Sequence, residues 1–225
     1  MTTSRKIILF VDRQRALIEA FAAELRRGSA FDHADIATNH SEVLQRVAAE
    51  QPTIIAFESS YTGRPLSREV ATLSAIAPEA RLVVLAARCD EHLVEQAVRL
   101  DLHGCLVKSE SLAELLNCLE QALGPAPVYS AEVERQLTRD PSGKPLLKTP
   151  TRLSRLSQIQ LQILHYLSLG MPVKEVARCM QISIKSADSH TYRIMRLLGV
   201  HNRLQLGAFA QQTGIVSYDA LLDCA

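Results

Sequence analysis

Hydrophobic residues in the first half of the chain alternate between short continuous runs and helical stripes. The runs at residues 6–11, 53–57 and 81–86 are apolar after their first residue, which is typical of strands covered on both faces. Weaker or shorter strands are expected at residues 33–37 and 105–107. Between the runs, apolar positions recur at helical spacing in five segments: 16–27, 41–50, 67–77, 90–100 and 112–123. This alternation predicts an α/β doubly wound five-stranded parallel sheet.

The pattern in the last third of the chain is helical throughout. Ser157 followed by Gln160 is a capping box that starts one helix, and Gly170 ends that helix. The turn at residues 181–183 joins two further helices, an arrangement typical of a helix-turn-helix. Gly214 is expected to end the last helix. The helices after Gly170 are expected at 173–180, 185–198 and 204–212.

The segment between these two halves is rich in proline and glycine, which favours turns and extended backbone. One or two amphipathic turns are expected within it, at residues 131–137. We therefore divide the chain into a domain at residues 1–123, a linker at 124–150 and an all-α domain at 151–225.

Composition narrows the class of protein. Apolar residues make up 47% and charged residues 22% of the 225 residues, so the chain can bury a core. No apolar run approaches the ~20 residues that cross a bilayer, and the five cysteines are scattered without metal-ligand spacing. These features favour a cytoplasmic protein with reduced thiols and without a metal or cofactor. The chain also lacks a Ser/His/Asp arrangement and a glycine-rich phosphate loop, so we do not expect an enzyme.

Charge is distributed unevenly along the chain. Residues 1–123 hold 13 Lys/Arg and 17 Asp/Glu, whereas residues 151–225 hold 8 Lys/Arg and 4 Asp/Glu. A basic C-terminal domain is the one expected to meet a polyanion.

Residues at the ends of the predicted strands carry a first resemblance. Asp12 follows the first strand, Glu58 the third and Lys108 the fifth, and Pro52 precedes Glu58 by six positions. With the run Gly104-Cys-Leu-Val-Lys108, this order resembles the receiver domain of bacterial response regulators over residues 5–123. The resemblance implies a flavodoxin-like strand order. In that family two adjacent acids hold Mg²⁺, an Asp accepts the phosphoryl group, a hydroxyl and a Lys contact it, and an aromatic side chain repacks.

Most of these functional positions depart from the family pattern. Arg13 replaces the second acid, Glu58 the phosphoacceptor Asp, Ala86 the hydroxyl and Cys105 the aromatic, while Asp12 and Lys108 remain. Mg²⁺ needs clustered oxygen ligands, and phosphoryl transfer depends on that ion. The extra methylene of Glu58 displaces its carboxylate by ~1 Å or more. We therefore interpret the domain as a degenerate pseudo-receiver that neither accepts phosphate nor needs it.

Two alternatives concern this site. Glu58 either pairs with Lys108, standing in for a phosphorylated acceptor, or is a solvated loop acid beside a structural lysine. Cys105 is either a small apolar filler or, less simply, a redox switch.

The C-terminal domain carries a second resemblance. Over residues 156–214 it is similar to the DNA-binding domain of LuxR/FixJ/NarL-type regulators. The matching positions are Leu156-Ser157, Gln160, Gly170, Lys174-Glu-Val-Ala177, Ile182-Ser183, His190, Ile194, Leu198-Gly-Val200, Asn202-Arg203 and Gly214.

The resemblance implies that the helix at residues 185–198 enters the major groove of DNA. Asp188 stands where the family usually has a Lys or Arg, so it either redirects base choice, by accepting from cytosine, or weakens binding. His190 is expected to be a packed, hydrogen-bonded core residue. The last helix either only contributes to the core of its own domain or also has an exposed face that forms a dimer seam. The candidate DNA-binding residues are Lys174, Lys185, Ser186, Asp188, Ser189, Arg193, Arg196 and Arg203.

Together these features predict a phosphorylation-independent, orphan-like member of the response-regulator family in the bacterial cytoplasm. We expect it to bind double-stranded promoter DNA as a homodimer, with RNA polymerase as a candidate partner. The alternatives are a protein-interaction protein and a ligand-sensing pseudo-receiver, in which DNA binding is weak or depends on a partner.

Overall fold

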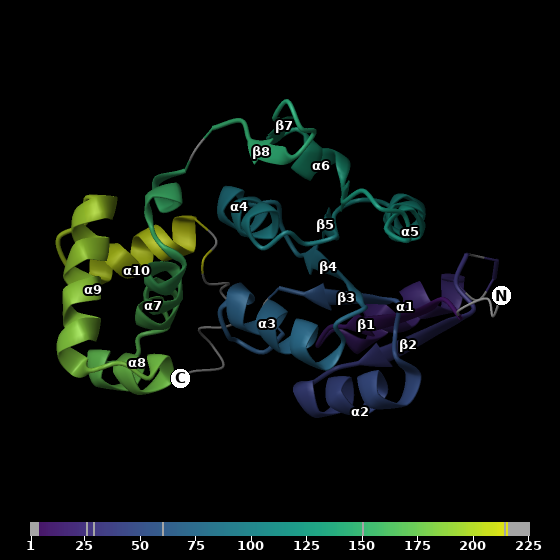
Figure 1. Ribbon diagram of the computed structural model, residues 1–225, viewed down its shortest axis with the longest axis horizontal. Coiled ribbons are helices and arrows are strands. Elements are labelled where there is room, and N and C mark those ends of the chain that lie inside the picture. The colour runs from purple at the N-terminus through teal and green to yellow at the C-terminus, as the bar shows by residue number, and fades with distance from the viewer. Residues whose placement is uncertain are drawn as a thin grey trace.

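The computed structural model describes residues 5–25, 27–28, 30–59, 61–149, 151–213 and 215. The predicted helix end at Gly214 and the cysteine at position 224 lie outside these residues. Within them the chain forms a sheet-based N-terminal domain and a helical C-terminal domain (Figure 1).

The N-terminal domain is built on a parallel sheet with the strand order β2-β1-β3-β4-β5-β6. Its first five strands confirm the α/β doubly wound sheet expected from the apolar runs, and β6 is an addition to it. The strands are β1 (Ile7–Val11), β2 (His33–Ala37), β3 (Ile54–Glu58), β4 (Arg81–Ala86), β5 (Gly104–Val107) and β6 (Val128–Tyr129).

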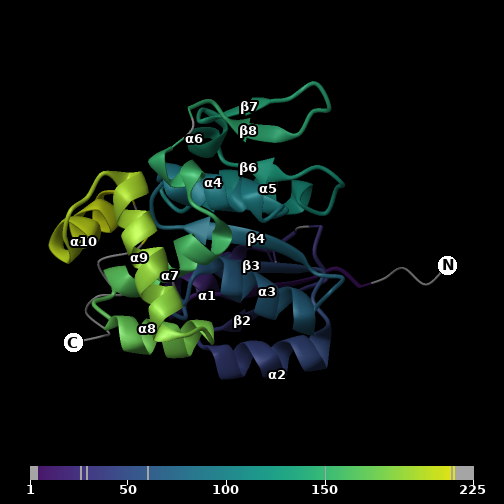
Figure 2. The ribbon, with the colours of Figure 1, turned by 60° about the vertical axis from the view of Figure 1, so that its left-hand side comes forward.

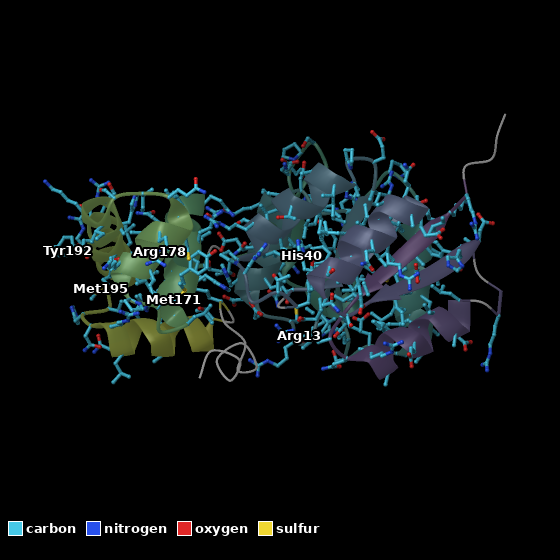
Figure 3. The ribbon with its side chains drawn as sticks, turned by 90° about the horizontal axis from the view of Figure 1, so that it is seen from below. Arg13, His40, Met171, Arg178, Tyr192 and Met195 are labelled. Carbon is cyan, nitrogen blue, oxygen red and sulfur yellow. The ribbon has the colours of Figure 1, made fainter. Side chains whose placement is uncertain are left out.

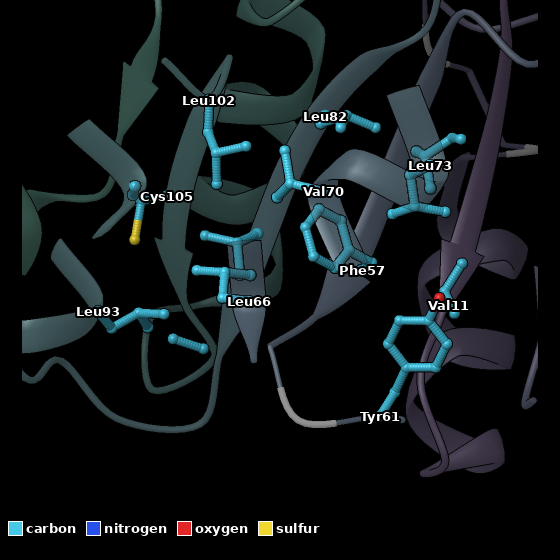
Figure 4. Packing of buried hydrophobic residues seen from close by; sticks show 14 of the residues in the cluster. Val11, Phe57, Tyr61, Leu66, Val70, Leu73, Leu82, Leu93, Leu102 and Cys105 are labelled. Carbon is cyan, nitrogen blue, oxygen red and sulfur yellow. The ribbon is translucent and has the colours of Figure 1, made fainter. Parts of the chain in front are cut away.

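Helices cover both faces of the sheet because successive strand residues point to opposite sides. Phe10 on β1 packs with Ile18 of α1 and Leu115 of α5 on one face. The neighbouring Val11 packs on the other face with Leu73 of α3, as Figure 4 shows. The helices are α1 (Arg15–Leu25), α2 (His40–Glu50), α3 (Leu66–Ile76), α4 (Glu91–Arg99) and α5 (Leu112–Gln121).

Most of the segment expected as a linker is folded onto the sheet, and the amphipathic turns expected at residues 131–137 are present as a short helix. It forms β6, α6 (Ala131–Glu134) and an antiparallel hairpin of β7 (Leu137–Arg139) and β8 (Pro145–Leu147), and Figure 2 shows the hairpin above β6. Val133 and Leu137 are buried against the core, and the Ser130 hydroxyl accepts a hydrogen bond from the Val107 amide at 3.2 Å. The backbone groups on the edge of β5 need partners, and β6 supplies them.

The C-terminal domain packs its helices around a separate apolar core that includes Leu164, Ile194 and Leu206. The predicted capping box is confirmed: Ser157 and Gln160 satisfy each other's backbone amides at the start of α7. Gly199 adopts a left-handed conformation with φ +69° just after α9, which favours glycine. The helical elements are the 3-10 helix η1 (Arg152–Arg155), α7 (Gln158–Ser168), α8 (Val173–Met180), α9 (Ile184–Leu198) and α10 (Arg203–Gln212).

Candidate nucleic-acid interface and receiver site

The carboxyl edge of the sheet holds a buried ion pair. Lys108 Nζ lies 2.5 Å from Asp12 Oδ2, and the two side chains are 9% and 2% exposed. The other carboxylate oxygen of Asp12 accepts a hydrogen bond from the Gln14 amide at 2.8 Å. Glu58 was one candidate partner of Lys108, whereas the ion pair of this lysine in the structure is with Asp12. Glu58 accepts a hydrogen bond from the Ser59 hydroxyl at 3.2 Å.

Arg13 occupies the position of the second acid, and its side chain holds a loop. Its Nε donates to the Tyr61 carbonyl at 2.9 Å, which ties the end of β1 to the β3–α3 loop. Both oxygens of Asp12 already accept hydrogen bonds, and Arg13 places a cation where a second carboxylate would be needed. No group of three or more His, Cys, Asp or Glu side chains suited to a metal occurs among the described residues. The residues present therefore do not fit the Mg²⁺ that a receiver would hold.

Two small side chains lie near this edge of the sheet, one at the end of β4 and one within β5. Ala86 at the end of β4 is 1% exposed and offers no hydroxyl, and Cys105 in β5 is fully buried. Burial raises the pKa of the Cys105 thiol, so the thiol stays protonated and unreactive. Its environment favours the apolar filler over the redox switch.

The α9 helix presents the predicted DNA-binding residues on an exposed surface. The Ser183 hydroxyl caps the helix by accepting from the Ser186 amide at 3.1 Å. Ala187, Ile194 and Leu198 are buried on the inner side and fix the orientation of the helix. The exposed predicted residues are Lys185, Ser186, Asp188, Ser189, Arg193 and Arg196.

Tyr192 belongs to the same surface, although no sequence motif singled it out. Its side chain is 69% exposed, and a shallow hollow is shared by Asp188, Ser189, Tyr192, Arg193 and Arg196. Figure 3 shows Tyr192 at the outer side of the C-terminal domain. The helical spacing of positions 188, 192 and 196 was the signal that could have found it.

The remaining predicted positions have more varied surroundings. Lys174 on α8 is exposed. Arg203 is also exposed, and its guanidinium donates to the Met171 carbonyl, which joins the start of α10 to the turn before α8. His190 is partly buried as expected, but its Nδ1 has no hydrogen-bond partner among the described residues.

The α10 helix has a large apolar side chain that its own domain does not cover. Leu206 and Ala210 are buried in the core, whereas Leu204 is 85% exposed.

None of the described helices is long and apolar enough to cross a membrane.

Comparisons with known proteins agree with this two-domain organisation. Residues 154–210 match the family of bacterial regulatory proteins called the luxR family. The glycerol metabolism activator of Pseudomonas putida is 26% identical over 57% of this chain and 60% of its own length. The transcriptional regulatory protein LnrK of Bacillus subtilis is 22% identical over 92% of this chain and 97% of its own.

Solved structures show the same fold. RcsB from Salmonella enterica, bound to the promoter rprA in the presence of a phosphomimetic, aligns with a TM-score of 0.68 at 16% identity. That alignment covers 92% of this chain and 98% of RcsB.

The fold and the exposed α9 surface define a receiver-like domain joined to a helix-turn-helix domain. Residues 154–210 of the C-terminal domain match the luxR-family model, and over 92% of its length the chain is similar to the transcriptional regulatory protein LnrK.

Proposed function

We propose that this chain is a phosphorylation-independent transcriptional regulator that binds double-stranded promoter DNA as a homodimer through α9. The observation that carries the proposal is the exposed surface of α9, where Lys185, Arg193 and Arg196 surround short polar side chains. Phosphate contacts by these cations supply affinity that does not depend on sequence. In this proposal the exposed side chains of Ser186, Asp188 and Ser189 contact base edges and supply the choice of site.

Phosphorylation independence is supported by the Asp12–Lys108 ion pair. In a phosphorylated receiver the acid at the position of Asp12 holds Mg²⁺ and the lysine at the position of Lys108 contacts the phosphoryl group. Here the two side chains form an ion pair with each other instead. Ala86 has no hydroxyl to follow a phosphoryl group, and Cys105 has no ring to repack. In this proposal the unphosphorylated chain is therefore the form that binds DNA.

The exposed Leu204 of α10 supports assembly as a dimer through the C-terminal domains. Two α9 helices would then contact successive half-sites, as in other dimeric helix-turn-helix proteins. A regulator of this kind acts in the bacterial cytoplasm, with RNA polymerase as a candidate partner at the promoter.

The test is selection of genomic fragments by the purified, untreated chain at two salt concentrations. We expect a discrete enriched sequence and an affinity that falls steeply with salt, because bound phosphates release counterions. Failure to enrich any sequence at either salt concentration would contradict the proposal and favour a protein partner.

A second candidate function, ligand sensing, is supported by a cavity of about 560 Å³ between the two domains. Burial raises the pKa of Asp90 in this cavity to about 6 and lowers the pKa of the neighbouring His92 to about 3. A thermal-shift screen with metabolites tests this function, because a ligand that binds only the folded chain raises Tm. The side chains around the cavity include Arg88, Asp90, His92, Glu132, Thr151 and Thr213.

A further inference from the structure

Helix α3 of the receiver-like domain holds the last turn of α8. Arg68 donates to the Cys179 carbonyl at 2.6 Å and lies 3.7 Å from Met180 Sδ. Its guanidinium carbon also lies 5.8 Å from the centre of the Tyr166 ring. Carbonyls in the last turn of a helix lack partners within that helix and attract cations. Arg68 therefore caps a helix of the other domain.

Two polar contacts from α7 extend this interface. Gln162 Nε2 donates to the Ser67 hydroxyl at 2.9 Å. The His165 ring lies between two backbone carbonyls, with Nε2 3.0 Å from that of Gly63 and Nδ1 3.1 Å from that of Ile215. The first carbonyl belongs to the β3–α3 loop of the receiver-like domain, so that loop is a docking surface for α7.

A second docking point lies on α4. Thr151, which caps η1, donates its hydroxyl hydrogen to the buried Glu95 carboxylate. Arg99 donates to the carbonyls of Ser154 at 3.1 Å and Leu156 at 3.3 Å. Two separate elements of the receiver-like domain thus hold the start and the middle of the C-terminal domain.

The β3–α3 loop is itself held from the degenerate receiver site. Arg13 donates to the Tyr61 carbonyl. The hydroxyls of Tyr61 and Thr62 both donate to the Glu69 carboxylate, which is 1% exposed. A buried carboxylate with two donors fixes the loop at its base. The arginine that is incompatible with a magnesium site therefore orders the surface on which α7 docks.

The docked arrangement leaves α9 open. Figure 1 shows α9 on the outer side of the C-terminal domain, with α7 on the side of the sheet. The docking contacts come from η1, α7 and α8. We call this arrangement, in which η1, α7 and α8 contact the receiver-like domain, the closed form. The cationic residues Lys185, Arg193 and Arg196 remain exposed in it.

We propose that the closed form is the form that binds DNA, with the β3–α3 loop acting as a fixed platform, held by Arg13, for the C-terminal domain. Undocking is then not a step in DNA binding, and the interface is supportive rather than autoinhibitory. This inference rests on the proposed function, since it describes how the same α9 surface is presented.

Hydrogen exchange of the full chain, with and without the enriched DNA fragment, tests the proposal. On binding DNA, we expect peptides from residues 184–198 to gain protection while those from 61–69 and 91–99 keep theirs. Gain at 184–198 with loss of protection at 61–69 and 91–99 would overturn the closed-form proposal and leave the proposed function intact. No change at 184–198 would instead reject DNA binding by α9, and both proposals with it.

Two neighbouring arginines, Arg13 and Arg15, allow a test variant and a matched control. We expect Arg13→Ala to speed exchange of peptide 61–69 at least tenfold and to leave DNA affinity unchanged or weaker. Arg15→Ala, which removes a surface arginine whose ion pair is with Glu19 of its own helix, serves as the control and should do neither. Tightening of DNA binding threefold or more by Arg13→Ala would show that the interface is autoinhibitory.

Discussion

For Lys108, the position in the fold could be predicted from the sequence, but its ion-pair partner could not. Its place after the fifth strand could be predicted from the order of apolar runs. Its partner could not, because Asp12 and Glu58 both follow strands that end at the same edge of the sheet. Only the three-dimensional positions of side chains distant in sequence distinguish these acids. The same holds for Arg13, whose substitution is visible in sequence but whose contact with the Tyr61 carbonyl is not.

The first residue-scale prediction concerns the buried ion pair. Lys108→Met should lower the free energy of unfolding by about 3 kcal/mol or more, because it leaves the Asp12 carboxylate buried without its cation. Urea denaturation measures the change. The control is the double variant Asp12→Asn with Lys108→Met, which removes both charges and should recover much of the loss. A single variant as stable as the original chain would show that the pair contributes little.

The second residue-scale prediction concerns Asp188. Asp188→Lys should change the preferred base at one position of the enriched sequence, because it replaces an acceptor on the exposed surface of α9 with a donor. Repeating the fragment selection with the variant measures this. Equal tightening on all sequences, with the preferred site unchanged, would mean that the aspartate only weakens phosphate contacts.

At the scale of elements, the apolar runs were sufficient for β1 to β5, and the helical spacing for α7 to α10. The two-residue strand β6 is too short to show any periodicity, and its segment is dominated by turn-forming residues. What places it is the unpaired edge of β5, a property of the assembled sheet. This is why the composition of residues 124–150 predicts a linker, although residues 128–147 form regular elements.

Gly104 tests the packing of β6. A Cβ at this position would lie 2.8 Å from Val128 Cγ2 and 3.0 Å from the Val128 carbonyl oxygen. Gly104→Ala should therefore cost about 1–3 kcal/mol of unfolding free energy. Gly207→Ala in α10, where a Cβ meets nothing within 4 Å, should instead be neutral or stabilising by up to ~1 kcal/mol. Thermal or urea denaturation compares them, and equal effects would contradict the close approach of β6.

The start of α4 gives a pH-dependent prediction. Burial raises the pKa of Asp90 from 3.8 to about 6, although its carboxylate caps the helix by accepting from the Leu93 amide at 2.7 Å. An acid with a raised pKa destabilises the folded chain where it is ionised, above pH 6, and this penalty shrinks as the pH falls toward 4. Asp90→Asn keeps the cap and should raise the free energy of unfolding at pH 7.5 by about 1–3 kcal/mol.

That gain should fall to about half by pH 5. Urea denaturation of both chains at pH 7.5 and pH 5 measures it. A gain that is the same at the two pH values would show that Asp90 is not desolvated.

At the scale of the whole molecule, the sequence predicted two domains and their order but not their contacts. Arg68, Gln162 and His165 lie at polar positions of their helices, where a solvated surface is the ordinary expectation. Their partners belong to the other domain, so no local pattern identifies them. The result is a molecule in which the receiver-like domain supports the DNA-binding domain while leaving α9 exposed.

The central claim is that DNA binding needs no phosphoryl group. The most direct measurement is the dissociation constant of the chain for its enriched DNA fragment, before and after incubation with acetyl phosphate and Mg²⁺, with intact mass recorded in parallel. We predict equal dissociation constants within twofold and no added mass. A stoichiometric phosphoryl adduct at Glu58, accompanied by tighter binding, would contradict the account.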